Sequence, residues 1–247
     1  MKRILVLVLL VTCSCCYFVD NALADTIILQ PSNQDSTLDQ ADSMISPGSH
    51  TMFYVHGVFY PNMYKRGIVQ FDLSTVPTGV IITSATLKLY INDNLDAGGR
   101  IFWAYRVTES WTESGVSWNS RDGSNPWSTS GGTYTTTGGA SSTAPSGKTW
   151  MTWDVTDIVK EWKENGQPNY GFLLKDGTEQ FTGASKLAGF LSKEGGRDND
   201  EPILEIEYSE PSIPVGGIIL DTNPFTWIML TATVMAFCLF ALTRSKL

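Results

Sequence analysis

Residues 84–91 read SATLKLYI, and the side chains of this stretch alternate between two faces of an extended chain. Leu87, Leu89 and Ile91 share one face, whereas polar and aromatic side chains occupy the other. Alternation with a period of two residues is typical of a β-strand that has one buried face. The stretch therefore predicts a strand that covers an apolar core.

The same alternation recurs along the chain. It is found at 67–73, 101–107 and 204–208, and a shorter apolar strand is expected at 170–174. Turns that contain Gly or Asn separate these segments. Many short strands at this spacing predict an all-β fold, an antiparallel β-sandwich of the jelly-roll kind.

Two segments depart from the strand pattern. Residues 155–165 (VTDIVKEWKEN) place Ile158, Val159 and Trp162 on one helical face, which predicts one short helix over an end of the sandwich. Residues 123–147 are rich in Ser, Thr and Gly, so we expect a long, partly mobile surface loop there.

The two ends of the chain predict export and membrane anchoring. Two basic residues and a short apolar run indicate a signal peptide at 1–24, with an uncleaved anchor as the alternative. Residues 225–243 carry no charge and are long enough to span a bilayer as a transmembrane helix. Two basic residues in the tail 244–247 place that tail on the cytoplasmic side. The alternative for 225–243 is a buried core helix.

One domain remains between these segments, at 25–210, and a Pro/Gly-rich linker follows it at 211–224. The domain contains none of the four cysteines, so it has neither a disulfide nor a thiolate metal site. We expect a single-pass protein of the cell membrane whose domain lies outside the cell.

Four groups of short motifs, in chain order, resemble one known family. They are FDLS (71–74) with SATLKLY (84–90); RVT (106–108) with WTE (111–113) and VSWN (116–119); WDVT (153–156) with NYGF (169–172); and SKE (192–194) with PIL (202–204). Together they resemble the DNRLRE domain, also called the disaggregatase-related domain, which is grouped with the carbohydrate-binding modules of family 96. The resemblance extends over roughly residues 25–208.

This resemblance implies a β-sandwich that often accompanies polysaccharide-degrading enzymes, and some members bind acidic polysaccharides such as alginate. The domain also occurs in bacterial and archaeal surface proteins without a catalytic partner, and no catalytic domain accompanies the motifs here. Residues 214–217 (PVGG) also resemble the tails of archaeal surface proteins. The tryptophans of the motifs are expected to build the core.

The sequence offers little for catalysis. His50 and His56 are the only histidines, and neither a phosphate loop nor a nucleophile elbow is present. Glu109 and Glu113 flank Trp111 and form the one pair that a glycosidase could use. We expect these two carboxylates to brace turns instead, so the protein is predicted not to be an enzyme.

The candidate sugar-binding residues are aromatic side chains outside the core pattern and the cations near them: Tyr60, Tyr64, Trp127, Tyr134 and Trp150, with Lys65, Arg66, Arg100 and Arg106. Sugar rings stack their C–H faces on aromatic rings, and Arg can bind a uronate carboxylate through two hydrogen bonds. Packing and internal ion pairs are the alternatives, above all a carboxylate partner for Arg66. The net charge of −8 argues against nucleic acid and allows a polyanion only at a local basic patch.

Two acidic clusters suggest a structural Ca²⁺. One lies near the first strand and the other before the last strand, and these strands are often neighbours in a jelly roll. The oxygen ligands would come from Asp35, Asp39, Asp198 and Asp200. Solvated loop charge is the alternative.

We therefore predict a non-catalytic, surface-displayed module that binds polysaccharide, acidic glycans included. The alternative is a structural or adhesion protein of the cell envelope that binds other envelope proteins, and a membrane-tethered lyase or hydrolase ranks third. Binding predicts exposed aromatic side chains close to cations. The structural alternative predicts buried aromatic side chains and a broad exposed apolar patch.

Overall fold

The computed structural model describes residues 24–42, 48–57, 63–179, 186–195 and 199–211. These residues form 11 strands and one helix. The elements are β1 (Asp25–Leu29), β2 (Gln34–Asp39), β3 (Met52–Gly57), β4 (Lys65–Gln70), β5 (Ile81–Leu95), β6 (Ile101–Val107), β7 (Tyr134–Thr143), β8 (Trp150–Asp154), α1 (Thr156–Lys163), β9 (Phe172–Asp176), β10 (Lys186–Leu191) and β11 (Ile203–Ser209).

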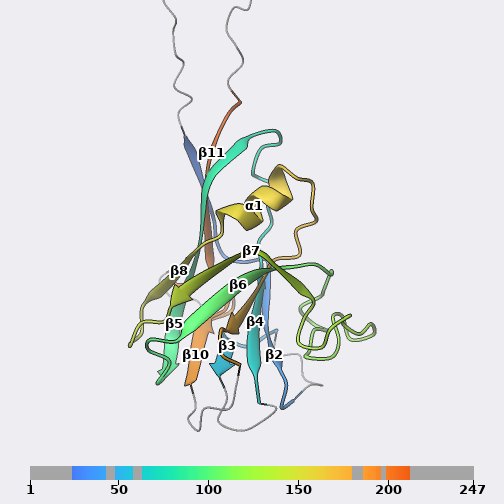
Figure 1. Cartoon of the computed structure of the whole chain (residues 1–247), viewed down its shortest axis with the longest axis vertical. Helices are drawn as coiled ribbons and strands as arrows, with labels where there is room; N and C mark the ends of the chain where they lie inside the picture. The colour runs from blue at the N-terminus through green and yellow to red at the C-terminus, as the bar shows by residue number, and fades with distance from the viewer. Residues whose placement is uncertain (1–23, 43–47, 58–62, 180–185, 196–198, 212–247) are drawn as a thin grey trace, which may run out of the picture. The chain divides into compact units, whose positions relative to one another are not determined.

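The strands pair in the order β1-β11-β5-β10-β3-β4-β9-β6-β7, with β2 beside β4 and β8 beside β5. All of these pairings are antiparallel. The sheet curls so that a first half (β1, β11, β5, β8, β10, β3) packs against a second half (β2, β4, β9, β6, β7) in a sandwich-like arrangement (Figure 1). The predicted all-β antiparallel fold is confirmed, and so is the expectation that the first and last strands are neighbours.

Residues 84–91 lie inside β5, which is the longest described strand at 15 residues. Leu87, Leu89 and Ile91 are fully buried, and the residues between them are partly exposed. β5 pairs with β11, β8 and β10, so this strand is the centre of the first half. The alternation in the sequence therefore identified the element around which the first half assembles.

Aromatic contacts join the two halves of the main core. The ring of Phe190 on β10 lies 5.7 Å from Phe53, 6.0 Å from Trp153 and 6.4 Å from Phe102, measured between centroids. The indole nitrogen of Trp153 also donates a hydrogen bond of 2.9 Å to the carbonyl of Phe102. Phe102 belongs to the second half, so these contacts hold the two halves together.

A second apolar cluster lies on the outer side of the second half. Phe172 and Leu174 on β9 face the main core, whereas Leu173 between them faces outward and is fully buried. Leu173 is covered by the segment 108–133, which brings Trp118 and Trp127 over it. The outer face of the second half is therefore covered over part of its area.

The structure confirms the predicted helix and contradicts the predicted loop. The helix is confirmed, with slightly narrower bounds than 155–165, and it packs Ile158, Val159 and Trp162 into the core beside β5 and β7 (Figure 1). The prediction of a loop throughout 123–147 is wrong, because β7 lies within it. β7 has no buried side chain, and its backbone pairing with β6 forms the strand without an apolar pattern.

No helix among the described residues is long and apolar enough to cross a membrane. The expected signal peptide and the expected span at 225–243 lie outside the described residues, as does all but the first residue of the expected linker.

The Phe190 contacts lead to a stability prediction. Replacing Phe190 with Ala removes the ring that touches both halves, and we expect the free energy of unfolding in urea to fall by about 3–5 kcal/mol. Ile81→Ala on β5 is the control, because Ile81 is 48% exposed and should change stability by less than about 0.5 kcal/mol. A Phe190→Ala protein as stable as the control would show that the halves are not joined through this ring.

Candidate functional site

Three aromatic side chains form a continuous strip on the outer face of the second half. Trp103 and Tyr105 on β6 point away from the core, because Phe102 and Ala104 beside them are fully buried in it. The rings of Trp103 and Tyr105 are parallel within 5°, with centroids 5.6 Å apart. Tyr134 on β7 continues the row, 5.1 Å from Tyr105. All three are partly exposed, and we name Trp103, Tyr105 and Tyr134 the aromatic strip.

A glycine on the neighbouring strand fixes the position of this strip. A Cβ atom at Gly139 on β7 would lie 2.4 Å from two ring atoms of Tyr105, closer than any side chain can come. The Tyr105 ring therefore lies directly against the backbone of β7 and has a defined orientation. This contact explains why a glycine is needed at position 139 of β7.

Two cations lie beside the strip. Lys175 on β9 is the registered partner of Trp103, and its Nζ lies 3.3 Å from the hydroxyl of Tyr134. The guanidinium carbon of Arg66 on β4 lies 5.7 Å from the centroid of Tyr134 and 4.9 Å from that of Trp118. The Nζ of Lys175 also lies 5.7 Å from the centroid of Tyr134. At these ring distances both cations are attracted to the faces of the rings.

A carboxylate holds both cations in place. Arg66 donates to Glu179 through Nε at 2.7 Å and Nη2 at 2.8 Å, and Lys175 lies 2.8 Å from the same carboxylate. Burial alone would raise the pKa of Glu179, but hydrogen bonds and charges from Arg66 and Lys175 outweigh it and lower the pKa. The group carries two positive charges and one negative charge, so it is locally basic. The carboxylate partner considered for Arg66 from the sequence is present.

The other predicted aromatic side chains lie elsewhere. Trp127 is 5% exposed in the second cluster, and its indole nitrogen donates to the carbonyl of Ser117 at 3.0 Å. Tyr64 packs against the same cluster. Trp150 is on β8 in the first half, edge-on to Tyr90. Tyr60 lies outside the described residues. Of the predicted aromatics that the structure describes, only Tyr134 belongs to the strip.

The other predicted cations are engaged in internal contacts or lie apart from the strip. Lys65 forms an ion pair with Asp39, and Arg100 donates from Nε to the buried Asp176 at 2.9 Å. The Nε of Arg106 is buried and has no hydrogen-bond partner among the described residues. Of the residues predicted from the sequence, Arg66 and Tyr134 lie in this group, whereas Trp103, Tyr105 and Lys175 were not among those predicted.

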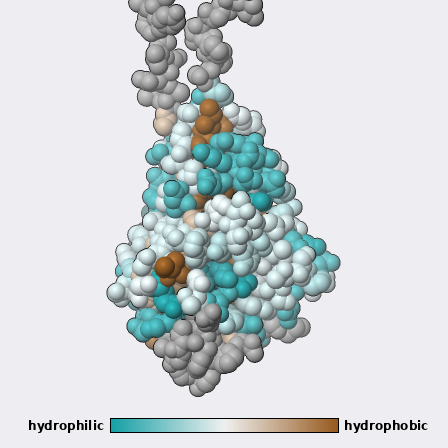
Figure 2. Space-filling model, in the orientation of Figure 1, coloured by the Kyte–Doolittle hydropathy of each residue, from teal (hydrophilic) through white to brown (hydrophobic). Residues whose placement is uncertain are grey.

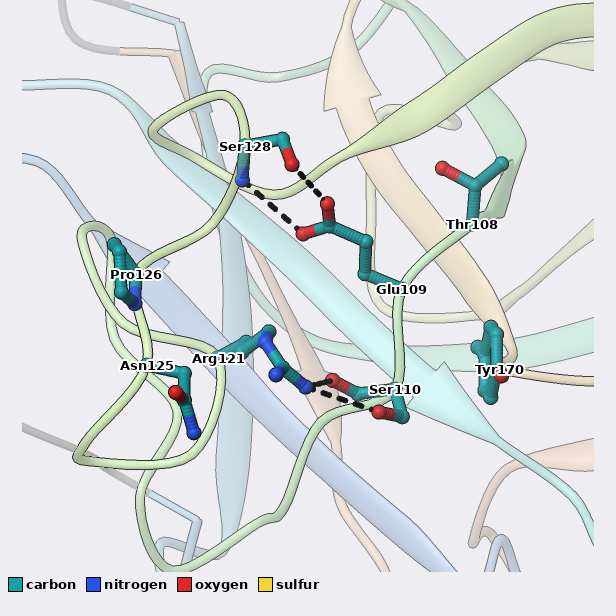
Figure 3. Close-up of a pocket in the computed structure, with 8 residues that line it drawn as sticks. All are labelled: Thr108, Glu109, Ser110, Arg121, Asn125, Pro126, Ser128 and Tyr170. Carbon is teal, nitrogen blue, oxygen red and sulfur yellow. Dashed lines mark hydrogen bonds between the residues drawn. The ribbon is translucent and has the colours of Figure 1, made fainter.

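A separate polar hollow of about 450 Å³ opens where β6 ends. It is lined by Thr108, Glu109, Ser110, Arg121, Asn125, Pro126, Ser128 and Tyr170 (Figure 3). Glu109 accepts hydrogen bonds from the backbone nitrogen of Ser128, at 3.1 Å, and from its hydroxyl. Arg121 donates to the carbonyl and hydroxyl of Ser110, at 3.1 and 3.0 Å. Glu109 therefore braces a turn, as expected from the sequence.

The predicted calcium ligands do not come together as a set. Asp39 lies at the opposite end of β2 from Asp35 and pairs with Lys65, and Asp198 lies outside the described residues. The carboxylates near Asp35 are instead those of Glu113 and Glu194, with oxygens within 4.8 Å of one another. Lys193 forms ion pairs with both glutamates, at 3.0 Å from Glu113. Asp200 does not belong to this carboxylate group.

Asp35 is 1% exposed, as is Asp176, but Asp176 forms an ion pair with Arg100, whereas no ion pair of the described residues involves Asp35. Burial raises its pKa to about 6, and the charges of Glu194 and Glu113 act in the same direction. Hydrogen bonds from the hydroxyl of Ser32 (2.6 Å) and the backbone nitrogen of Lys193 (2.9 Å) oppose the shift but do not cancel it. This carboxyl therefore titrates in a range where other carboxyl groups are normally ionised.

The raised pKa of Asp35 predicts how stability depends on pH. The folded protein binds this proton more tightly than the unfolded chain, whose pKa is near 3.8, so the free energy of unfolding falls as pH rises from about 4 to about 6. The contribution of this one group is about 3 kcal/mol. Asp35→Asn should remove that part of the pH dependence, measured by urea unfolding in a chelator, whereas Asp25→Asn at the exposed start of β1 should not. Equal slopes in wild type and Asp35→Asn would contradict the assignment.

The fold and the strip together define a class: an antiparallel β-sandwich that carries a row of partly exposed aromatic rings on the outer face of one half. The model of carbohydrate-binding module family 96 matches residues 24–208, the greater part of the chain, so this protein belongs to that family. The family resemblance noted from the motifs is thereby confirmed. No curated protein matched the chain.

Proposed function

We propose that this protein is a non-catalytic module that binds polysaccharide along the aromatic strip and is displayed at the cell surface. The observation that carries the proposal is the row of three parallel, partly exposed rings beside Lys175. Sugar rings present apolar C–H faces that stack on such rings, and neighbouring polar groups then fix their orientation. Membership of a carbohydrate-binding family supports the same assignment.

The cations give the proposed site a preference for acidic sugars. The described hydrogen bonds of Arg66 engage Nε, Nη1 and Nη2, with Glu179 and the carbonyl of Gly131 as acceptors, so Arg66 holds the site together. Lys175 keeps donor capacity, because an ammonium has three N–H groups and its described polar partners are Glu179 and Tyr134. We assign to Lys175 the direct contact with a uronate carboxylate.

The distribution of exposed apolar residues favours this function over the structural alternative. Among the described residues, the large apolar side chains that are exposed are Ile28, Met63, Ile81, Leu95 and Ile101. They lie on β1, just before β4, at the two ends of β5 and at the start of β6, and the face shown in Figure 2 is mostly hydrophilic with separate small apolar areas. A protein that packs against envelope partners would be expected to expose one broad apolar patch.

The export that we expect from the sequence would place the domain at the cell surface. The expected signal peptide and the apolar stretch at 225–243 would hold the domain outside the cell, next to envelope or environmental glycans.

The binding proposal predicts a specific mutational pattern. Trp103→Ala and Tyr105→Ala should each weaken binding to a responsive polysaccharide at least about tenfold, because each removes one stacking surface. Gly139→Ala should also weaken binding, since the new methyl group displaces the Tyr105 ring while every binding group remains. Lys175→Ala should weaken binding to alginate more than to a neutral glucan. The measurement is affinity electrophoresis and calorimetry with the full chain in a detergent that has no sugar headgroup.

Trp150→Ala and Lys160→Ala are the matched controls. Trp150 is a partly exposed tryptophan on the first half, and Lys160 is on α1. Both variants should bind as the wild type does. Loss of binding in Trp150→Ala with full binding in Trp103→Ala would place the site on the other half, and a folded wild type that binds no polysaccharide in a broad panel would refute the function.

We also propose that Ca²⁺ binds at Asp35, Glu113 and Glu194. Three carboxylates within 4.8 Å supply the hard oxygen donors that Ca²⁺ prefers, and they connect β2, the segment after β6 and the segment after β10. The ammonium of Lys193 now neutralises the two glutamates, so Ca²⁺ must displace it. The ion would act structurally, because its ligands join three segments that are distant in sequence.

Calcium should therefore stabilise the protein. Millimolar Ca²⁺ is expected to raise the Tm of the wild type by several degrees at pH 7, in proportion to the ratio of free Ca²⁺ to Kd. Glu194→Gln should abolish the shift, whereas Glu205→Gln, on the exposed side of β11, should keep it. If Ca²⁺ leaves the Tm of the wild type unchanged, Lys193 is the permanent counter-ion of this group.

A further inference from the structure

The polar hollow at the end of β6 is built from different residues than the aromatic strip. Its volume of about 450 Å³ lies within the range of about 300–1,000 Å³ found for small-molecule sites, and it is open to solvent. Its lining contains one guanidinium, one carboxylate, one amide, three hydroxyl side chains and the ring of Tyr170. Donors, acceptors and one aromatic wall are together the chemistry that recognises a hydroxyl-rich ring.

The polar groups of the hollow are held in place before any ligand arrives. Asp122 accepts hydrogen bonds from the backbone nitrogen of Asn125 at 2.7 Å and from its amide at 2.8 Å, which fixes the turn. Ser128 and Thr133 hold the carboxylate of Glu109. Burial alone would raise its pKa, but the hydrogen bonds from these two residues and the charge of Arg121 outweigh burial and lower the pKa. Fixed groups lose little conformational entropy on binding, so they favour recognition.

Several of these groups keep hydrogen-bonding capacity. The described hydrogen bonds of Arg121 both use Nη1, and nothing in the described part of the chain accepts from Nε or Nη2. The side-chain oxygen of Asn125 has no described donor, because Asn125 is held through its nitrogen atoms. The carboxylate of Glu109 accepts two hydrogen bonds from Ser128 and one from the hydroxyl of Thr133, which leaves part of its capacity for about four such bonds unused. The hollow therefore offers two donors and at least two acceptors to a ligand.

The charges in the lining balance, which indicates the kind of ligand. Arg121 contributes one positive charge and Glu109 one negative charge, and Asp122 lies 3.8 Å from Arg121 on the same turn. An anionic sugar would meet two carboxylates, so a neutral sugar is favoured.

A second hollow of about 430 Å³, beside Asp72 and Asn169, is a weaker candidate for a sugar site. It has a carboxylate but no cation in its lining, and the described bonds of Asn169 already use its amide nitrogen and oxygen.

We propose that the hollow lined by Glu109, Arg121, Asn125 and Tyr170 is a second sugar-binding site, which takes a single neutral monosaccharide unit such as the end or a branch of a glycan. The aromatic strip suits the length of a chain, whereas the hollow has room for one ring. A glycan that reaches both sites binds with an effective concentration gain, so the domain is bivalent. This site does not depend on the strip, and either can exist without the other.

The test is a titration of the full chain, in a detergent without a sugar headgroup, with methyl glycosides of neutral hexoses, pentoses, deoxyhexoses and N-acetylhexosamines. Saturation-transfer NMR and calorimetry are the readouts. At least one glycoside should bind with a Kd of about 1–10 mM, as expected for one sugar ring. Ser110→Trp, which fills the hollow from an exposed position, and Arg121→Gln, which removes the charged donor, should each weaken binding at least about tenfold.

Ser124→Trp is the matched control, because Ser124 is exposed on the same loop but does not line the hollow. It should bind the glycoside normally, as should Trp103→Ala, and urea unfolding should show all variants to be folded. The proposal is overturned if no glycoside binds up to about 50 mM, well above the expected Kd. It is also overturned if binding survives Ser110→Trp and Arg121→Gln. Loss in Trp103→Ala alone would place the monosaccharide on the strip, which would support the proposed function and reject the second site.

Discussion

The alternation of side chains along β6 determines which of its residues are buried in the core and which lie on the outer face of the second half. Phe102 and Ala104 must face inward, because the Phe102 ring meets Phe190 of the first half and its carbonyl accepts the indole hydrogen bond of Trp153. Side chains of a strand alternate, so this constraint turns Trp103 and Tyr105 outward. The contact that joins the two halves therefore also places Trp103 and Tyr105 on the outer face. The aromatic strip keeps this position as long as the core stays folded.

The segment 108–133 covers one part of that outer face, and the aromatic strip beside it is partly exposed. It places Trp118 and Trp127 over Leu173 and so buries the neighbouring apolar surface. Trp118 also stacks on Arg66, and Gly131 leaves room for this contact, since a Cβ atom there would lie 2.7 Å from a guanidinium nitrogen. The covering segment thus holds Arg66 of β4 in place beside the strip, through Trp118 and Gly131, and supplies most of the lining of the polar hollow.

The sequence predicted the buried face of a strand where one face is apolar and the other polar. It could not do so where both faces carry apolar or aromatic side chains. Residues 84–91 separate aliphatic from polar side chains, so the buried face of β5 was evident. Residues 101–107 carry aromatic rings on both faces, Phe102 on one and Trp103 on the other, so no local pattern could say which ring is exposed. Trp127 stands in a Ser/Thr/Gly-rich stretch and was predicted to be exposed, but it is buried by an apolar face formed far away in sequence. The pairing of Arg66 with Glu179 spans 113 residues and could not be found from spacing.

The overall charge of −8 and the local basic group limit the physical ways in which the proposed binding of acidic glycans can work. Long-range attraction is absent, because the whole chain repels a polyanion, and beyond about 10 Å such forces are screened in any case. Recognition must then come from contact. Glu179 is central here, since it fixes two cations that would otherwise repel each other, at the cost of one positive charge. The proposed site would lack the faster association that long-range attraction gives and would select its ligand by contact geometry. A ligand with one sugar face for the rings and a single carboxylate for Lys175 would satisfy these constraints best.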